Sequence, residues 1–209
     1  MKIAVVAANG RVAKKVIEEA VNRGFEVTGF GRRENDTKAQ NYVRKDLFDL
    51  TAEDLKGFDA VVDALGAWNE ETLPLHSTSL RHLCDILSGT DTRLLVVGGA
   101  GSLYVNKEHT VTVSEGSDFP DAFKPLASAM AKALGELRER KDVKWTYISP
   151  AGDFQADGER SGAYILGGEE LVLNDRGESI ISYADYAIAM VDEIGSGNHI
   201  QQRISVVRK

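Results

Sequence analysis

Residues 2–13 read KIAVVAANGRVA, which joins a short apolar run to a turn of small residues and the start of an amphipathic stretch. Apolar residues then recur at helical spacing as far as Val21, and Gly24 provides a helix stop. A second apolar run, FEVTGF, follows at residues 25–30. The order strand, tight turn, helix, strand predicts the first βαβ unit of a nucleotide-binding sheet.

The rest of the chain continues this alternation. A short helix is expected at 51–57, longer helices at 72–88, 125–140 and 183–194, and further strands at 42–46, 59–65, 93–97, 143–149 and 203–207. This pattern predicts an α/β fold of the Rossmann type, a three-layer αβα sandwich around a mostly parallel, doubly wound sheet. We expect one NAD(P)-binding domain over residues 1–209, with a small substrate-side portion from about 151 to 180, where the alternation stops. A long loop at 103–124 is expected to carry function or a lid, with a small hairpin at 110–113.

Composition narrows the class of partner. The 209 residues carry a net charge of −7, which argues against nucleic acid and anionic membranes as partners. The single cysteine, Cys84, forms no internal disulfide, and the four histidines show no metal spacing, so no metal site is expected. The chain begins directly with a strand and has no apolar run of spanning length, which predicts a cytoplasmic protein. The oligomeric state stays open.

The first turn has the residues that a dinucleotide pyrophosphate needs. In open parallel sheets, ligands bind outside the carboxyl ends of the strands. Gly10 allows close backbone approach, Asn9 offers a side-chain donor, and Arg11 adds positive charge beside the first helical turn. Together with the flanking Ala7 and Val12, these residues are the expected phosphate cradle, the alternative being a purely structural turn.

The end of the second strand bears on the choice between NAD(H) and NADP(H). Arg32 and Arg33 stand there without an acid, which favours NADP(H) over NAD(H); two solvated surface arginines are the alternative interpretation. At the other strand ends, Asp46 and Leu47 are expected to flank adenine, with a solvated loop aspartate as the alternative for Asp46. Leu65 and Gly66 are expected to approach a ribose. Gly98 and Ser149 complete the predicted cofactor site.

Catalytic residues are harder to assign. Short-chain dehydrogenases use a Tyr-x-x-x-Lys pair, but here Ser128 stands four residues before Lys132, and a serine hydroxyl titrates far too high to replace a phenol. Both are expected to be ordinary helix residues, and no Gly-x-Ser-x-Gly elbow indicates a hydrolase. The catalytic residues are therefore unknown, with Ser102 and Tyr104 as weak candidates. The residues expected to line the substrate pocket, from strand-end position alone, are Trp68, Ser102, Tyr104, Asp153 and Phe154.

Four segments carry a family resemblance: 7–13, 97–103, 149–151 and 181–187, which read AANGRVA, VGGAGSL, SPA and ISYADYA. On these, nearly the whole chain resembles the atypical short-chain dehydrogenase/reductases. The similarity is to the small NAD(P)H-binding group described as NADH-flavin reductase, related to biliverdin reductase B and the NmrA-like proteins. Two of the three glycines of the family turn are alanines here. A methyl group at Ala7 is expected to crowd the turn, and one at Ala13 to hold the helix slightly off the strand.

The resemblance implies an NAD(P)H-binding oxidoreductase. The preferred interpretation is an NADPH-dependent reductase that passes hydride directly to a flavin or quinone-like small-molecule acceptor, which requires no nucleophile. One alternative is a non-catalytic NADP(H)-sensing regulatory protein. The second is a sugar-nucleotide epimerase or dehydratase, for which the chain lacks the tyrosine and a C-terminal substrate domain.

Overall fold

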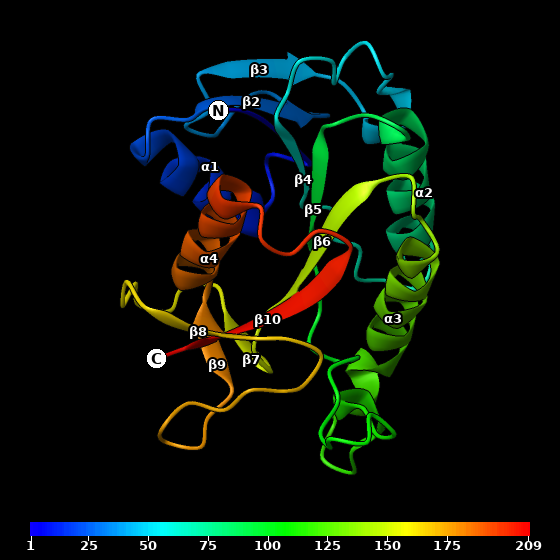
Figure 1. Ribbon diagram of the computed structural model, residues 1–209, viewed down its shortest axis with the longest axis vertical. Coiled ribbons are helices and arrows are strands. Elements are labelled where there is room, and N and C mark those ends of the chain that lie inside the picture. The colour runs from blue at the N-terminus through cyan, green and yellow to red at the C-terminus, as the bar shows by residue number, and fades with distance from the viewer.

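A central sheet of eight strands runs through the computed structural model, which describes residues 1–209 (Figure 1). The strand order is β3-β2-β1-β4-β5-β6-β10-β8, and all neighbours are parallel except β10 and β8. The chain therefore winds outward from β1 in both directions, which confirms the predicted Rossmann-type fold. The strands are β1 (Lys2–Val6), β2 (Glu26–Gly31), β3 (Asn41–Arg44), β4 (Ala60–Asp63), β5 (Arg93–Val97), β6 (Lys144–Ser149), β8 (Tyr164–Gly167) and β10 (Gln202–Arg208).

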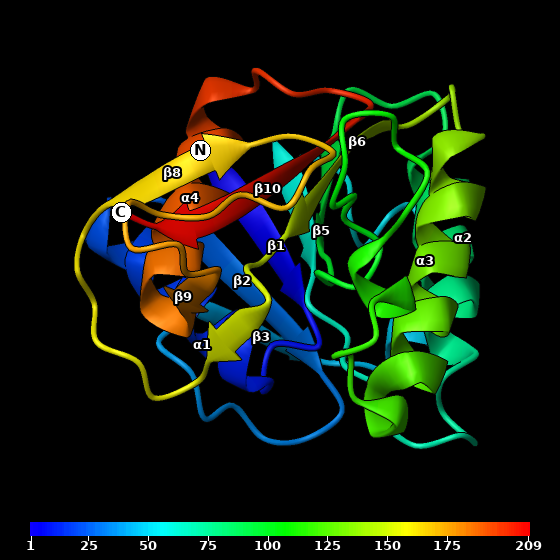
Figure 2. The ribbon, with the colours of Figure 1, turned by 90° about the horizontal axis from the view of Figure 1, so that it is seen from below.

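Helices cover both faces of this sheet (Figure 2). Helices α1 (Arg11–Asn22) and α4 (Tyr183–Ser196) lie on one face, and α2 (Leu75–Leu87) and α3 (Lys124–Arg138) lie on the other. Each helix pair encloses its own apolar core. Val16 and Ile17 belong to one core with Met190, whereas Leu83 and Leu134 belong to the other with Trp145. The three-layer sandwich is thus built from the apolar stripes that the helical spacing predicted.

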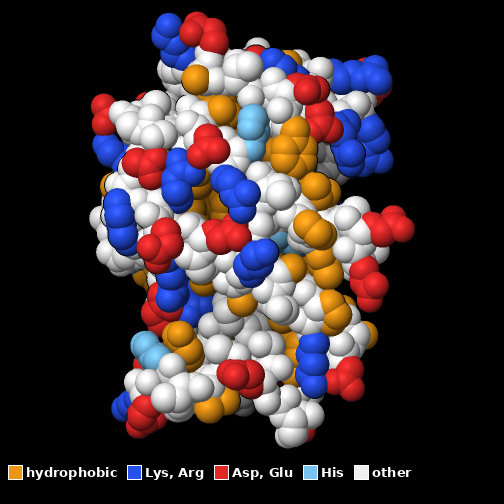
Figure 3. Space-filling view, turned by 90° about the vertical axis from the view of Figure 1, so that its right-hand side faces the viewer, with side chains coloured by type: hydrophobic (Ala, Val, Ile, Leu, Met, Phe, Trp, Pro, Cys, Tyr) orange, Lys and Arg blue, Asp and Glu red, His pale blue; other side chains and the backbone are white.

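The α2–α3 side of the molecule has a mixed surface. Figure 3 looks onto this side and shows acidic and basic side chains interspersed, with no broad basic area. No helix of the structure has the length and apolarity needed to cross a bilayer.

The segment expected to form a short helix at 51–57 is instead a series of turns. The carboxylate of Asp54 accepts hydrogen bonds from both the backbone N–H and the hydroxyl of Thr51, each at 2.7 Å. With the bond from Asp54 N–H to the Thr51 hydroxyl (3.4 Å), these contacts resemble a helix capping box, but the turns that follow do not continue into a helix. The only helical turn nearby is the 3₁₀ turn Leu47–Asp49 that precedes this segment.

The long loop after β5 is tied to the C-terminal part of the chain. The backbone of Tyr104 accepts a hydrogen bond from Leu171 (2.8 Å) and donates one to Glu169 (3.0 Å). The expected hairpin is present in a minimal form: Tyr104 bridges Thr112 in antiparallel orientation, flanked by hydrogen bonds from Val105 N–H to Val111 (3.0 Å) and from Val113 N–H to Leu103 (2.9 Å). Tyr104 also bridges Glu170, and 3₁₀ turns follow at Val113–Glu115 and Asp121–Phe123. Between residues 151 and 180 the chain adds β7 (Asp153–Gln155), which pairs with β9 (Ile180–Ser182) in a separate two-stranded sheet.

Candidate functional site

The carboxyl ends of β1, β2, β4, β5 and β6 lie at one edge of the parallel sheet, because these strands pair in register. The residues that follow these strands include most of the predicted cofactor site.

The turn after β1 closes tightly even though a glycine of the family pattern is missing. Ala7 adopts a left-handed backbone conformation with φ of 57°, and its carbonyl accepts a hydrogen bond from Gly10 N–H at 3.0 Å. For a residue with a Cβ this conformation costs about 1–2 kcal/mol. The expected crowding at Ala7 therefore takes the form of backbone strain. The methyl group of Ala13 is fully buried within the α1–α4 core.

The N-terminus of α1 is open to a ligand. Gly10 is its N-cap and no side chain caps the first turn, so the first backbone N–H groups have no partner within the helix. A Cβ on Gly10 would lie 3.3 Å from the carbonyl oxygen of Ala7, on the crowded inner side of the turn. An uncapped helix N-terminus of this kind suits an anionic group such as a pyrophosphate.

Asn9 turns its side chain away from this helix end. Its Nδ2 donates to the carbonyl of Glu34 (2.9 Å) and to Oδ1 of Asp36 (2.6 Å), and its Oδ1 accepts from the hydroxyl of Tyr42 (2.6 Å). The Lys14 ammonium and, to a lesser degree, Asn9 lower the pKa of Asp36. Asn9 therefore joins the first turn to the loop after β2, and only its backbone is left to meet a phosphate.

Three arginines gather at the ends of β2 and β3. Arg32 and Arg33 are exposed, and Nε of Arg32 lies 3.8 Å from Oδ2 of Asp46. The third is Arg44, which pairs in register with Gly31 and was not identified from the sequence. The sequence feature that could have pointed to Arg44 was the basic end of a short strand. Only the parallel pairing of β3 with β2 places Arg44 beside Arg32.

The residues expected near adenine and ribose differ in how exposed they are. The carboxylate of Asp46 accepts from Phe48 N–H (3.0 Å) and caps the 3₁₀ turn, and Leu47 is buried. Trp68 is 71% exposed, and its Nε1 would lie 3.2 Å from a Cβ on Gly66, so the indole stands over this glycine. Trp68 is therefore available as a wall on the solvent side of the strand ends.

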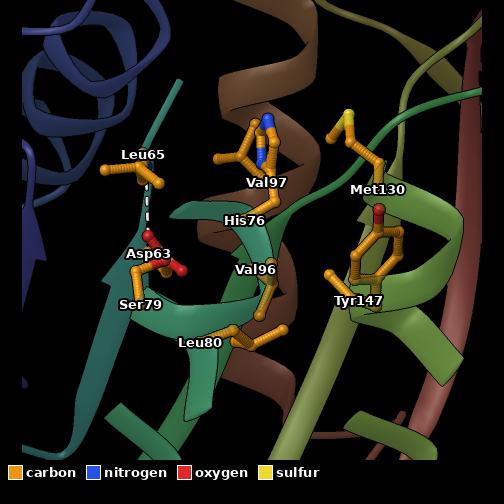
Figure 4. A pocket seen from close by; sticks show the side chains of 10 residues that line it. Asp63, Leu65, His76, Ser79, Leu80, Val96, Val97, Met130 and Tyr147 are labelled. Carbon is orange, nitrogen blue, oxygen red and sulfur yellow. Dashed lines mark hydrogen bonds between the residues drawn. The ribbon is translucent and has the colours of Figure 1, made fainter. Parts of the chain in front are cut away.

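A cavity of about 10 Å³ lies under the ends of β4 and β5 (Figure 4). Burial raises the pKa of Asp63 to about 6, and a hydrogen bond from Leu65 N–H (3.0 Å) acts in the opposite direction. Ser79 Oγ is buried there without a partner. Burial also lowers the pKa of His76, whose Nε2 bonds the carbonyl of Ala67 at 3.0 Å. The cavity has room for about one water molecule and none for a nicotinamide, so it is not where the cofactor would bind.

Gly98 and Ser149 differ in what they offer a cofactor. A Cβ on Gly98 would lie 2.2 Å from Cε1 of Tyr147, so the turn after β5 requires glycine. The N–H of Gly99 donates to the Tyr147 hydroxyl (3.2 Å), and burial raises the pKa of Tyr147 to about 12. Ser149 is fully buried and its hydroxyl has no partner, so the side chain is not exposed to a ligand at the strand ends.

Ser102 and Tyr104 are held by a buried arginine. Ser102 Oγ accepts from Nη1 of Arg203 (3.0 Å), and Arg203 also binds the carboxylate of Glu169. The Tyr104 ring is stacked on His109, with 4.5 Å between centroids, and the Arg203 guanidinium lies 5.8 Å from the Tyr104 centroid. Both catalytic candidates are thus built into the contacts that fix the long loop.

The remaining pocket candidates lie beside α4. The ring of Phe154 packs against Tyr183 and Tyr186, with centroid distances of 4.2 and 4.9 Å, whereas Asp153 is exposed. The guanidinium of Arg11 lies 5.9 Å from the Tyr183 centroid and forms a 3.1 Å ion pair with Asp157. Arg11 therefore connects the N-terminus of α1 to this segment.

Two further expectations concern residues away from the strand ends: the Ser128–Lys132 pair and a metal site. Ser128 and Lys132 are both exposed on α3, and the Lys132 ammonium lies 4.0 Å from Glu136. No group of three or more histidine, cysteine or acidic side chains is arranged to hold a metal ion.

Known proteins share this fold over the full chain. The model of an NAD(P)H-binding family matches residues 7–195. A solved structure from Streptococcus pneumoniae, described as "a putative NADH-flavin reductase", is 53% identical, covers 100% of both chains and has a TM-score of 0.98. The protein YwnB of Bacillus subtilis, which is uncharacterised, is 41% identical over 99% of this chain and 98% of its own.

A more distant solved structure, described as a "putative epimerase" from Bacteroides thetaiotaomicron, is 32% identical. It covers 99% of this chain and 96% of its own, with a TM-score of 0.86. The family match indicates a dinucleotide ligand, NAD(P)H. The open N-terminus of α1 and the glycine turns are consistent with such a ligand. The chain therefore belongs to the NAD(P)H-binding family of Rossmann-fold proteins.

Proposed function

We propose that the protein is an NADPH-dependent reductase that transfers hydride directly to a flavin or a quinone-like acceptor. The observation that carries the cofactor preference is the arginine-bearing loop after β2, which Asn9 fastens to the phosphate-binding turn. Family membership supplies the coarser function, NAD(P)H binding. The description of the Streptococcus pneumoniae protein favours a flavin among the acceptors.

The residues at the strand ends fit a dinucleotide. The uncapped first turn of α1 offers backbone N–H groups to a pyrophosphate. Gly10 and Gly98 allow the two turns to close tightly, because a Cβ would lie 3.3 Å from the Ala7 carbonyl at Gly10 and 2.2 Å from the Tyr147 ring at Gly98. Arg32 and Arg33 are exposed where a 2′-phosphate would lie. These features form a cradle along the edge of the sheet.

The proposed hydride transfer requires no catalytic side chain. A bound nicotinamide supplies the hydride, and the protein contributes orientation. Tyr147 fixes the turn at Gly98 and Gly99 from below, and the exposed indole of Trp68 offers a flat apolar wall. We place the acceptor between Trp68 and the segment from about 151 to 180. Such a site needs no nucleophile and no phenol at position 128.

The test is NADPH oxidation by the purified protein with FMN, FAD and a quinone as separate acceptors. We expect turnover with at least one of them. Tight NADPH binding without turnover would favour the regulatory sensor instead, and a lack of NADPH binding would contradict both functions.

A matched pair of glycine variants sharpens this test. Gly10→Ala places a methyl group in the phosphate turn, whereas Gly135→Ala adds one on α3, where no other atom lies within 4 Å. We expect Gly10→Ala to weaken NADPH binding and Gly135→Ala to leave it unchanged.

A further inference from the structure

Arg44 and Glu34 form an exposed ion pair beside the loop that carries Arg32 and Arg33. The distance from Nη1 of Arg44 to Oε1 of Glu34 is 3.1 Å. We propose that Arg44 is a third ligand of the 2′-phosphate of NADPH, and that Glu34 is the internal anion that the phosphate displaces from it. The proposal rests on the proposed function, since it specifies how the same cofactor is recognised.

The pairing of β3 with β2 places Arg44 at the correct end of the sheet. Arg44 is the last residue of β3 and lies opposite Gly31, the last residue of β2. Its Nε donates to the carbonyl of Arg32 at 3.1 Å. That bond holds the guanidinium against the backbone of the loop that carries the exposed Arg32 and Arg33.

The loop itself is held in one conformation by three side chains. The carbonyls of Arg32 and Glu34 accept hydrogen bonds from Arg44 and Asn9 at 3.1 and 2.9 Å. The Arg33 carbonyl lies 2.9 Å from the Tyr42 hydroxyl, whose single proton it shares with Asn9 Oδ1. Gly31 makes this approach possible, because a Cβ there would lie 2.4 Å from the Tyr42 hydroxyl and 2.5 Å from Asn9 Oδ1. The arginines therefore extend from a loop that is ordered before any ligand binds.

The local charges favour an anion. Three arginines face two carboxylates, Glu34 and Asp46, and thus retain a net positive charge. The other charges nearby are already paired, Lys14 with Asp36 and Lys45 with Asp54. A phosphate monoester carries about −1.5 to −2 charges at neutral pH and accepts paired hydrogen bonds from guanidinium groups.

A bound phosphate can readily displace the Glu34 carboxylate from Arg44. Its side chain is 89% exposed and that of Arg44 is 68% exposed. Ion pairs as exposed as this contribute little to stability, so the loss of this one costs little. The carboxylate keeps Arg44 in place in the free protein, and a doubly charged phosphate competes effectively for the same nitrogens.

The experiment measures binding of adenosine 2′,5′-bisphosphate and adenosine 5′-monophosphate to the full-length protein by calorimetry. We expect wild type to prefer the bisphosphate. Arg44→Ala should weaken bisphosphate binding about tenfold and leave monophosphate binding unchanged. Glu34→Gln should strengthen bisphosphate binding. Glu53→Gln is the matched control, because it removes the same charge from an exposed acid paired with Lys56 and should change neither affinity.

The possible outcomes separate the inference from the proposed function. If Arg44→Ala keeps the full preference for the bisphosphate, the role of Arg44 is overturned while NADPH binding stands. If wild type binds both nucleotides equally, the NADPH preference and the role of Arg44 both fail, and if it binds neither, the proposed function itself fails. Arg44→Lys keeps the charge without the planar fork and should lose part of the preference. It tests the proposal even where the alanine variant disturbs the strand.

Discussion

The ring of Tyr147 occupies the space beside Gly98, where any side chain on that glycine would have to lie; a Cβ there would be 2.2 Å from Cε1 of the ring. The hydroxyl of the same tyrosine accepts a hydrogen bond from the N–H of Gly99. One buried phenol thus shapes the turn after β5 from both its ring and its hydroxyl.

Gly98→Ala should lower the free energy of unfolding by about 1–3 kcal/mol, because a methyl group is forced against a fully buried ring. Urea unfolding measures this loss. Tyr147→Leu in the same chain should recover part of the Gly98→Ala penalty, so the two changes should be less than additive. Strict additivity would show that Gly98 and Tyr147 do not share the space.

Asp63→Asn should raise stability at neutral pH. The folded-state pKa of Asp63 is about 6, above the unfolded value of about 3.9. The folded state therefore binds this proton more tightly, and the stability contributed by Asp63 is present below about pH 4 and is lost as pH rises through about 6. Between about pH 4 and pH 6 this linkage lowers the free energy of unfolding of the wild-type protein by about 3 kcal/mol. The measurement is the stability of wild type and variant across this pH range, and a constant difference between them would contradict the account.

Ala7→Gly should stabilise the protein by about 0.5–1 kcal/mol. Glycine removes the left-handed strain of about 1–2 kcal/mol, and its greater freedom in the unfolded chain offsets part of this gain. Ala8→Gly is the control, since Ala8 is fully buried and has no positive φ, so that this change should destabilise. Thermal unfolding compares the two, and equal losses in both variants would refute the strain at Ala7.

Ser102→Ala should lower stability by about 1–3 kcal/mol, because it leaves Nη1 of the buried Arg203 without one of its acceptors. Turnover per folded molecule should be unchanged if Ser102 only positions the loop. Denaturant unfolding and steady-state kinetics on the same preparation separate these effects. A selective fall in kcat at unchanged stability would instead make Ser102 catalytic.

Local patterns in the sequence predicted the sheet and its helices well. The apolar run at residues 93–97 coincides with β5, and the stop at Gly24 follows the end of α1. Each of these signals depends on residues close in the chain. The short helix at 51–57 was wrong: the capping contacts between Thr51 and Asp54 form, but the residues after Thr51 adopt a series of turns.

The details of the site depended on contacts between distant residues. Asn9 bonds Asp36, 27 positions away, and no local pattern predicts that its amide would be used there. Arg44 could be recognised only after β3 was paired with β2. The link from Ser102 to Arg203 spans 101 positions. Sequence reasoning thus located the strand ends but could not specify which side chains meet above them.

Equilibrium binding of NADPH and NADH to the wild-type protein tests the proposed cofactor site most directly. The arginines at the ends of β2 and β3 predict that both bind and that NADPH binds at least about tenfold more tightly, with an advantage that shrinks as salt rises. Equal affinity, tighter binding of NADH, or no binding of either nucleotide would contradict it.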